Sequence, residues 1–490
     1  MFIILLVPVA VPLLLGAVAL VRAASWVRRF SGVVSSVAIL GSGIVAVVLG
    51  QGSAPLSSAG ILRADALSAY MLAVVGAVGL VATWGGLAPR ADAPVHTEAG
   101  RAPLGMYAAL VCIFLSAMSL AVLADNLGVM WVAIEATTIA TAFLVGHNRT
   151  RRSLEAAWKY VILAPAGVAI AFLGIVLIYA SSTGTPTPTL SWLALTQMSL
   201  HLDPALVRVG AALAALGFAT KAGLAPMHSW LPDAHSQAPA PVSALMSGVL
   251  LSVALYAILR IQAVANAVIG PDFLRALLVA GSLLSLAIAA ALLLRQRDYK
   301  RMLAYSSIEH MGVMALGAAV GPTALPAVLL YILSHGLIKA SLFILAGRLL
   351  TAEGTPIISD VRSLLARRPG LAVPWLIGIV ALLGFPPFGI FFSEVGIILA
   401  GWATGMGVVM SVALALMLVI FAGMTRLTVG MMFGSADLPA PRVDSVLDRS
   451  PHGPIAPLAL ALGACAIIPF LSGPIGTVLS DAAVALSWTP

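Results

Sequence analysis

The sequence predicts an all-α, polytopic membrane protein with about fourteen transmembrane helices. Hydrophobic residues make up 61% of its 490 residues and charged residues only 9%, whereas soluble domains are roughly 45–50% apolar and about 25% charged. Apolar stretches of about 20 residues, the length that crosses a bilayer as a helix, recur along the chain. Lysines and arginines gather in alternate connections between these stretches. Together these observations exclude a soluble domain.

The first predicted span begins at the N-terminus. The chain is apolar from Phe2 onwards and has no basic segment before it, so residues 2–21 are predicted to form a retained span rather than a cleaved signal peptide. The length criterion then places the other spans in order along the chain. The predicted spans are 2–21, 31–50, 65–87, 105–123, 126–147, 158–180, 206–226, 240–260, 272–294, 302–320, 323–348, 371–401, 403–433 and 453–474.

Basic residues predict the orientation of these spans. Of the 26 lysines and arginines, 20 fall in odd-numbered loops, namely Arg22, Arg28, Arg29, Arg90, Arg101, Arg149, Arg151, Arg152, Lys159, Arg295, Arg297, Lys300, Arg301, Arg348, Arg362, Arg367, Arg368, Arg426, Arg442 and Arg449. Even-numbered loops and span entrances hold only Arg63, Arg208, Arg260 and Arg275. Because positive loops stay in the cytoplasm, both termini are predicted on the outer face. The net charge of +8 therefore reflects topology, and nucleic-acid binding is not expected.

Cysteine usage predicts that the chain carries no cofactor or metal of its own. Cys112 and Cys465 are the only cysteines, and each lies singly in an apolar segment. A disulfide framework, a zinc site or an iron–sulfur cluster would need several cysteines at short spacing. The glycines of Gly41-Ser42-Gly43 follow no strand, so we expect them to serve helix packing rather than nucleotide binding.

Two helix breaks predict an internal repeat. Spans four to eight begin on the cytoplasmic side and spans nine to thirteen begin outside, which makes two five-helix units of opposite orientation. The fourth member of each unit is interrupted, span seven at Gly223 and Pro226 and span twelve within 384–389. Paired breaks at corresponding positions are typical of transport sites. The predicted parts are an N-terminal region 1–104, a first repeat 105–262, a second repeat 271–433 and a C-terminal loop and span 434–490.

Four segments carry a resemblance to a known family. They are RRSLEAAWKY at 151–160, LAPMHSWLPDAHSQAPAPVSAL at 224–245, RMLAYSSIEHMG at 301–312 and HGLIKASLF at 335–343. In order and spacing these resemble the antiporter-like membrane subunits shared by respiratory complex I, multi-subunit sodium/proton antiporters and membrane-bound nickel–iron hydrogenases. The pair Glu309-His310 and the segment ALYAILR at 254–260 resemble most the F-subunit branch of hydrogenase-4 and formate hydrogenlyase complexes.

The resemblance also implies a cellular location and partner subunits. It implies a bacterial inner membrane, discontinuous seventh and twelfth spans, and association with other membrane subunits. Hydrophilic redox subunits of the nickel–iron hydrogenase or dehydrogenase type would complete the complex. The transported ion would be the proton, with Na⁺ as the alternative.

Ionisable side chains inside the spans are the candidate functional residues. A charged side chain at membrane depth costs roughly 2.5–3.5 kcal/mol on insertion scales, and it usually faces a polar cavity or a partner. The candidates are Glu135, Lys221, Glu309, His310, His335, Lys339 and Glu394.

Glu135 has no ion-pair partner nearby in sequence, and the only charge preceding Lys221 in its span is Arg208, at the entrance. The resemblance implies that they pair and act as an input switch, in which a small movement of the carboxylate loads or releases a proton. The alternative is a static ion pair that fixes two helices, although such pairs are weak stabilisers.

The second half holds the remaining candidates. His335 and Lys339 are four residues apart and share one helix face, and a histidine can accept and donate a proton near neutral pH. Alternatively, His335 bonds a carbonyl and Lys339 extends to the cytoplasm. Glu394 matches the terminal carboxylate of the family. Glu309 and His310 lie about one turn deeper than a basic cluster, so an interfacial position is their alternative.

Span eight departs from the complex I pattern. Where those relatives carry a lysine or histidine, this chain has Ser252, whose hydroxyl orders water but holds no charge at pH 7. Either water bridges Lys221 to His310 and His335, or this half conducts differently. His228 and His235 follow span seven and are expected in a cytoplasmic loop, where they either line a proton entrance or are simply solvated.

Three functions are compatible with the sequence. The leading one is a proton-translocating subunit of a redox complex, because a charged seam occurs without any cofactor motif. The second is a subunit of a cation/proton antiporter that needs no redox partner. The third is a non-conducting scaffold whose charges serve helix packing alone.

Overall fold

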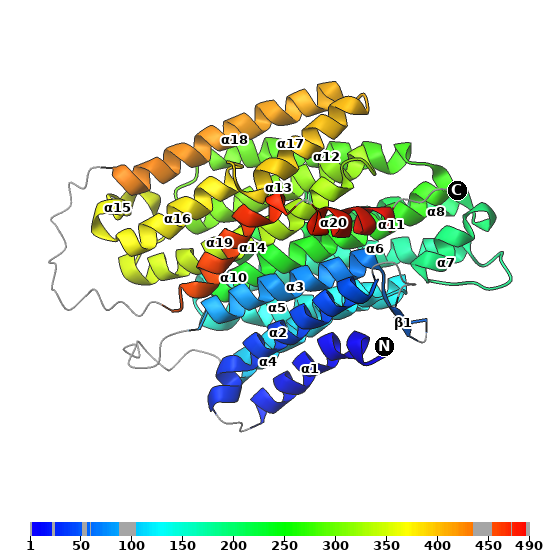
Figure 1. Ribbon diagram of the computed structural model, residues 1–490, viewed down its shortest axis with the longest axis horizontal. Coiled ribbons are helices and arrows are strands. Elements are labelled where there is room, and N and C mark those ends of the chain that lie inside the picture. The colour runs from blue at the N-terminus through cyan, green and yellow to red at the C-terminus, as the bar shows by residue number, and fades with distance from the viewer. Residues whose placement is uncertain are drawn as a thin grey trace.

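The structure is a computed structural model that describes residues 2–21, 25–50, 56–58, 60–87, 104–434, 453–471 and 473–486. These ranges form a bundle of helices that run mostly along one direction (Figure 1). Some residues used in the loop count lie outside the described residues, namely Arg22, Arg90, Arg101, Arg442 and Arg449. Most of the predicted C-terminal loop, 435–452, also lies outside them.

The N-terminal half contains eleven of the numbered α-helices and a small ribbon. The helices are α1 (Phe2–Leu20), α2 (Ser25–Gly50), α3 (Ala66–Gly85), α4 (Leu104–Leu123), α5 (Leu127–Val145), α6 (Arg151–Ser181), α7 (Trp192–Gln197), α8 (Pro204–Ala222), α9 (Trp230–Gln237), α10 (Ala240–Leu245) and α11 (Leu251–Ile269). Short turns η1 (Gly146–Asn148) and η2 (Ser199–His201) follow α5 and α7, and a π-helical turn, η3 (Met246–Leu250), joins α10 to α11.

The C-terminal half also consists of helices. Its helices are α12 (Asp272–Leu293), α13 (Tyr299–Val320), α14 (Leu325–Glu353), α15 (Leu364–Arg367), α16 (Pro369–Leu382), α17 (Gly389–Ala403), α18 (Gly407–Phe433), α19 (Ala456–Ile467) and α20 (Pro474–Val484). Two short turns, η4 (Ile358–Asp360) and η5 (Ile468–Phe470), complete it.

One feature departs from the all-α prediction. Residues β1 (Leu56–Ser58) and β2 (Leu62–Ala64) form an antiparallel two-stranded ribbon with Ser57 opposite Arg63. Gly60 in the connection has φ +68°, a conformation that glycine adopts without a steric penalty. The ribbon is too short to leave a periodic signal, and it leads directly into α3.

The described helices support a polytopic membrane protein. Ten of them are long and apolar enough to cross a bilayer, or eleven if the bent pair Ala456–Phe470 and Ile475–Val484 is one span. The predicted count of about fourteen also included three shorter apolar helices, Ile4–Leu20, Pro369–Leu382 and Gly389–Ala403, and the more polar α13. The chain is interrupted at both predicted breaks, between α8 and α9 and between α16 and α17.

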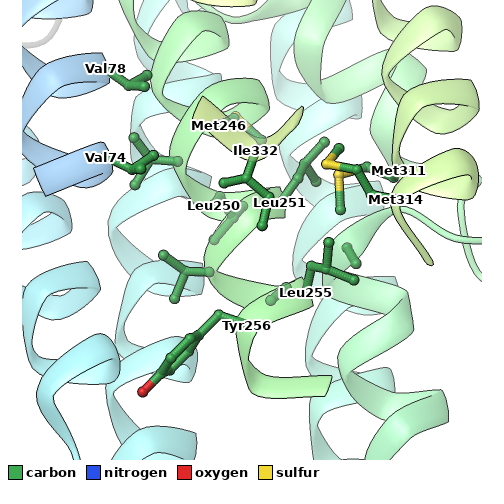
Figure 2. Packing of buried hydrophobic residues seen from close by; sticks show 14 of the residues in the cluster. Val74, Val78, Met246, Leu250, Leu251, Leu255, Tyr256, Met311, Met314 and Ile332 are labelled. Atoms are coloured by element: carbon green, nitrogen blue, oxygen red, sulfur yellow. The ribbon is translucent and has the colours of Figure 1, made fainter. Parts of the chain in front are cut away.

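Helices α11 and α14 occupy the centre of the bundle. In Figure 1, α1, α2 and α4 lie on one side of them, and α12, α17 and α18 lie on the other. Figure 2 shows the apolar packing at this centre, where side chains from α3, η3, α11, α13 and α14 meet. The labelled residues are Val74, Val78, Met246, Leu250, Leu251, Leu255, Tyr256, Met311, Met314 and Ile332. These apolar contacts pack the central helices against one another.

Small residues let α6 and α8 approach closely. A Cβ added at Gly217 would meet the backbone of Gly167 and Ala171 at distances that real side chains do not adopt. Gly43 of α2 likewise lies against the backbone of Ala73 in α3, which confirms a packing role for this glycine. Small-residue contacts of this kind are typical of membrane helix pairs.

We expect Gly217→Ala to destabilise the protein by about 1–3 kcal/mol, because the added methyl group overpacks the α6–α8 contact. Gly41→Ala is the matched control, since a Cβ at Gly41 meets nothing within 4 Å. Thermal unfolding of the purified protein in detergent measures both. Equal midpoints for the two variants would contradict the close contact.

Candidate functional site

Lys221 lies in the last turn of α8 and is completely buried. The helix ends there because Gly223 takes the left-handed conformation, with φ +74°, and its N–H bonds the Thr220 carbonyl. A Cβ at Gly223 would collide with Leu231 of α9. The glycine therefore lets α8 end close to α9, with the lysine inside the bundle.

Lys221 and Glu135 are joined through a threonine. The lysine Nζ donates to Thr138 Oγ1 at 2.6 Å and to the Tyr160 hydroxyl at 2.9 Å. Thr138 Oγ1 in turn donates to Glu135 Oε2 at 2.9 Å. The direct ion pair that the resemblance implied is not among the salt bridges of the described residues. In its place there is a hydrogen-bonded chain from carboxylate to ammonium.

The structure differs from the prediction at His235, which was expected in a cytoplasmic loop after span seven. It lies in helix α9 and is completely buried, so a solvated position is wrong for this residue. Its ring lies between Trp230 and Phe343, with centroid distances of 6.1 Å and 5.6 Å. Neither ring nitrogen has a hydrogen-bond partner within the described part of the chain. His228 precedes α9 and is partly exposed, nearer to the expected surface position.

Asp233 joins the two halves of the chain at one end of the bundle. Its carboxylate pairs with Lys159 of α6 at 3.0 Å and with Arg301 of α13 at 3.1 Å. These two basic residues come from separate loops that the charge pattern placed on the same side of the membrane. The contact agrees with that placement, and it fixes α9 between α6 and α13.

Lys339 of α14 does not extend to the surface. It is completely buried, and its Nζ donates to the Leu303 carbonyl at 2.7 Å and to Ser306 Oγ, both on α13. His335, one turn earlier, is also buried, and both ring nitrogens lack a partner among the described residues. The alternatives of a surface-seeking lysine and a carbonyl-bonded histidine are therefore wrong.

His310 and Glu394 are connected through a tyrosine. The Nδ1 atom of His310 lies 2.7 Å from the Tyr331 hydroxyl, which donates to Glu394 Oε1 at 2.8 Å. His335 follows on the other side of His310, with ring centroids 5.3 Å apart. A series of proton-exchanging groups thus runs from α14 through α13 to α17.

Glu309 and Glu394 line one cavity. The cavity has a volume of about 210 Å³ and is otherwise lined by apolar side chains of α16 and α18, with Leu383 between α16 and α17, which leaves room for several water molecules. Glu309 and His310 are buried between helices, at 6% and 1% exposure, so neither side chain extends to the surface of the bundle. The two carboxyl groups therefore border the same space.

The second break positions Glu394. Helix α16 ends at Leu382, and Gly384 beyond it has φ +69°. A Cβ at Gly384 would collide with the Glu394 carboxylate. The absence of a side chain at this position therefore lets the carboxylate reach back over the break toward Tyr331.

Serines lie in and beside span eight, where complex I relatives carry a lysine or histidine. Ser252 is buried and donates to the Gly248 carbonyl of its own helix at 3.1 Å. The adjacent π-turn η3 places Ser247 Oγ 2.9 Å from Ser307 Oγ on α13. Such turns frequently occur at functional sites. Ser247 and Ser307 thus connect the two halves near the Ser306 partner of Lys339.

The sequence analysis did not identify several residues that contact the candidate side chains. Thr138 lies three residues after Glu135, and Tyr331 lies four before His335, so helical spacing placed each on the face of a known candidate. Arg260, which was counted with the even loops, is completely buried and pairs with Asp65 at 2.6 Å. Within the described ranges, no three His, Cys, Asp or Glu side chains gather as a metal site requires.

Comparisons with known proteins identify the family of this chain. Residues 124–421 match the family described as NADH:quinone oxidoreductase/Mrp antiporter, TM. A hydrogenase-4 component F homolog from Methylacidiphilum infernorum is 38% identical over 72% of this chain and 74% of the relative. A Na(+)/H(+) antiporter subunit from Alkalihalophilus pseudofirmus is 28% identical over 80% of this chain and 77% of that protein.

A solved structure shares the whole fold. A chain of the membrane-bound sulfane sulfur reductase, an archaeal respiratory membrane complex, superposes with a TM-score of 0.84 and 25% identity over 98% of this chain and 97% of its own. The resemblance inferred from the four sequence segments, including the hydrogenase-4 branch, is confirmed. The chain belongs to the NADH:quinone oxidoreductase/Mrp antiporter family and is an antiporter-like membrane subunit of the type found in complex I, hydrogenase-4 and Mrp complexes.

Proposed function

We propose that this chain translocates protons within a multi-subunit redox complex of the hydrogenase-4 or formate hydrogenlyase type. The observations that carry the proposal are two hydrogen-bonded series of proton-exchanging groups inside the bundle, one from Glu135 through Thr138 to Lys221 and one from His310 through Tyr331 to Glu394. Chemistry in hydrophilic partner subunits, nickel–iron hydrogenase-like or dehydrogenase, drives the movement. This subunit contributes no redox cofactor, and its neighbours are other membrane subunits of a bacterial inner membrane.

Each group has a role in this proposal. Glu135, Thr138 and Lys221 form the input switch, because a shift of the carboxylate changes the hydrogen bonding of the ammonium. His235, with Ser247 and water near Ser252, passes the proton toward Lys339. His335, His310 and Tyr331 carry it onward to the cavity of Glu309 and Glu394, from which it leaves.

The proposal includes a membrane topology of fourteen spans. Fourteen spans result if the three shorter apolar helices and α13 are counted with the candidate spans, α16 and α17 forming one broken span. The repeats then cover 105–262 and 271–433 in opposite orientation, and the termini lie on the outer face. The contact of Lys159 and Arg301 with a single aspartate supports this arrangement, since both basic residues come from loops assigned to the cytoplasm.

A subunit of a cation/proton antiporter is the second candidate. The relative from Alkalihalophilus pseudofirmus, whose name describes such a function, aligns with most of this chain. In that case a sodium gradient alone would drive protons through the same seam, without redox turnover.

Proteoliposomes containing the purified complex distinguish the two functions. We expect acidification or alkalinisation of the lumen to begin on addition of the redox substrates in sodium-free buffer. We expect no proton movement when a sodium gradient is imposed without those substrates. Proton movement driven by sodium alone, together with none during redox turnover, would replace the first function with the second.

A further inference from the structure

The cavity beside Glu394 has an unpaired carboxylate in its wall. Glu309 is only 6% exposed, yet its nearest polar contact among the described residues is His310 Nε2, 4.0 Å from Oε2, which is beyond hydrogen-bond distance. Tyr331 donates to Oε1 of Glu394, which leaves Oε2 of that carboxylate available to another donor. Burial of a carboxylate without a partner is unfavourable, so the cavity lacks a donor that its own chemistry calls for.

The rest of the cavity wall is apolar. Apolar walls with a few convergent polar groups are typical of ligand sites. The volume of about 210 Å³ lies below the roughly 300–1,000 Å³ of pockets for drug-sized ligands, so a ligand of this cavity is smaller than a drug. The apolar lining residues are Leu382, Leu383, Leu414, Met417, Leu418 and Phe421.

The cavity lies near the edge of the bundle. Helix α18, which supplies half of the lining residues, forms that edge (Figure 1). Leu418 in the wall is 68% exposed, and Met417 beside it is partly exposed. The wall thus extends to the outer surface of a helix that is long and apolar enough to cross the bilayer. A ligand dissolved in the bilayer therefore meets the cavity from this side, without crossing the packed centre.

The carboxylates and the apolar wall together define the ligand. An ionised carboxylate forms strong, charge-assisted hydrogen bonds with an ammonium group, whereas an anion is repelled. The apolar side chains favour a ligand that buries methylene groups. A neutral alcohol has the methylene groups without the charge, and an inorganic cation has the charge without the methylene groups. A small primary alkylammonium ion has both.

We propose that the cavity binds a small primary alkylammonium ion, whose –NH₃⁺ group pairs with Glu309 and Glu394 while its chain lies against the apolar side chains of α16 and α18. The binding itself does not depend on proton transport. Its consequence rests on the proposed function, because an occupied cavity would block proton release at Glu394 and make this a site of inhibition.

Equilibrium dialysis of radiolabelled amines against the assembled complex in nanodiscs, without redox substrates, measures the binding. Uptake by empty nanodiscs is subtracted. We expect hexylamine to bind saturably and roughly tenfold more tightly than butylamine, because each buried methylene group contributes about 0.8 kcal/mol, or about fourfold. Hexan-1-ol, which has the same chain without the charge, is expected not to displace it. Displacement by equal concentrations of hexan-1-ol or of sodium chloride would overturn the proposal, the latter in favour of an inorganic cation site.

Two variants assign the binding to this cavity. Glu309→Gln keeps the size of the side chain and removes its charge, and we expect hexylamine to bind at least about tenfold more weakly. Leu414→Phe keeps both carboxylates and fills part of the space, so it should weaken binding as well. Glu155→Gln is the control and should bind hexylamine like wild type, since Glu155 is an exposed carboxylate on α6. Wild-type affinity in either cavity variant would overturn the proposal.

A separate measurement keeps the failure of this site distinct from failure of the proposed function. Redox-driven proton movement by the wild-type complex without amine tests the proposed function alone. If hexylamine binds as expected and the complex moves no protons, the site stands and the proposed function fails. If protons move and no saturable binding occurs, the site fails and the proposed function stands.

Discussion

Replacing Lys221 with alanine is expected to reduce proton translocation by roughly a hundredfold or more, the usual effect of removing a positioned proton-transfer group. Lys221 is completely buried and donates to Thr138 and Tyr160, and Thr138 in turn donates to Glu135. Glu135→Gln should have a comparable effect, because it removes the charge at the other end of the same chain.

The double variant tests whether the two residues act together. If Glu135 and Lys221 form one switch, the variant that carries both changes translocates no worse than either single variant. Strictly additive losses would show two independent steps. The measurement is protons moved per redox turnover in sealed proteoliposomes, compared at equal turnover rates.

Thr138→Val tests the hydrogen-bonded connection between Glu135 and Lys221. This change keeps both charges and removes only the hydroxyl that joins them, so we expect partial loss of translocation. Thr137→Val is the matched control, because Thr137 is buried on the same helix and donates to the Ile134 carbonyl instead. Equal activity of the two valine variants would show that the connection through Thr138 is not used.

Local sequence signals predicted the helix breaks well. Gly223 and Gly384 adopt left-handed conformations, and both were identified because glycine and proline interrupted otherwise apolar segments. The buried lysines were equally visible, since a charge within a long apolar stretch stands out. These features depend on the residues immediately around them.

Contacts between residues that are far apart in the sequence could not be predicted in the same way. His235 lies in the polar segment Trp230–Gln237, which has the composition of a surface loop, and its burial depends on Phe343 more than one hundred residues later. Tyr331 was not among the candidates, because nothing near it in the sequence shows that its hydroxyl meets Glu394. Arg260 and Asp65 are almost two hundred residues apart, so each was assigned to a span end. The burial and partners of these residues depend on tertiary contacts.

The second large effect is expected at Glu394. Its carboxylate lies at the end of the series His310, Tyr331, Glu394 and borders the cavity shared with Glu309. Glu394→Gln preserves size and hydrogen bonding but cannot exchange a proton near neutral pH. We expect it to lower proton release by roughly a hundredfold, while the complex still assembles and its redox chemistry remains measurable.

Two further variants define what the carboxylate does. Glu394→Asp should retain part of the activity, because the acid remains but is withdrawn from Tyr331 by one methylene group. Tyr331→Phe should also lower release, since it breaks the contact between His310 and Glu394 while preserving the ring. Glu155→Gln is the control, as Glu155 is an exposed carboxylate paired with Lys159 at 2.8 Å. If Glu394→Gln vesicles move protons as fast as wild type at equal redox turnover, Glu394 is a packing group and the outlet lies elsewhere.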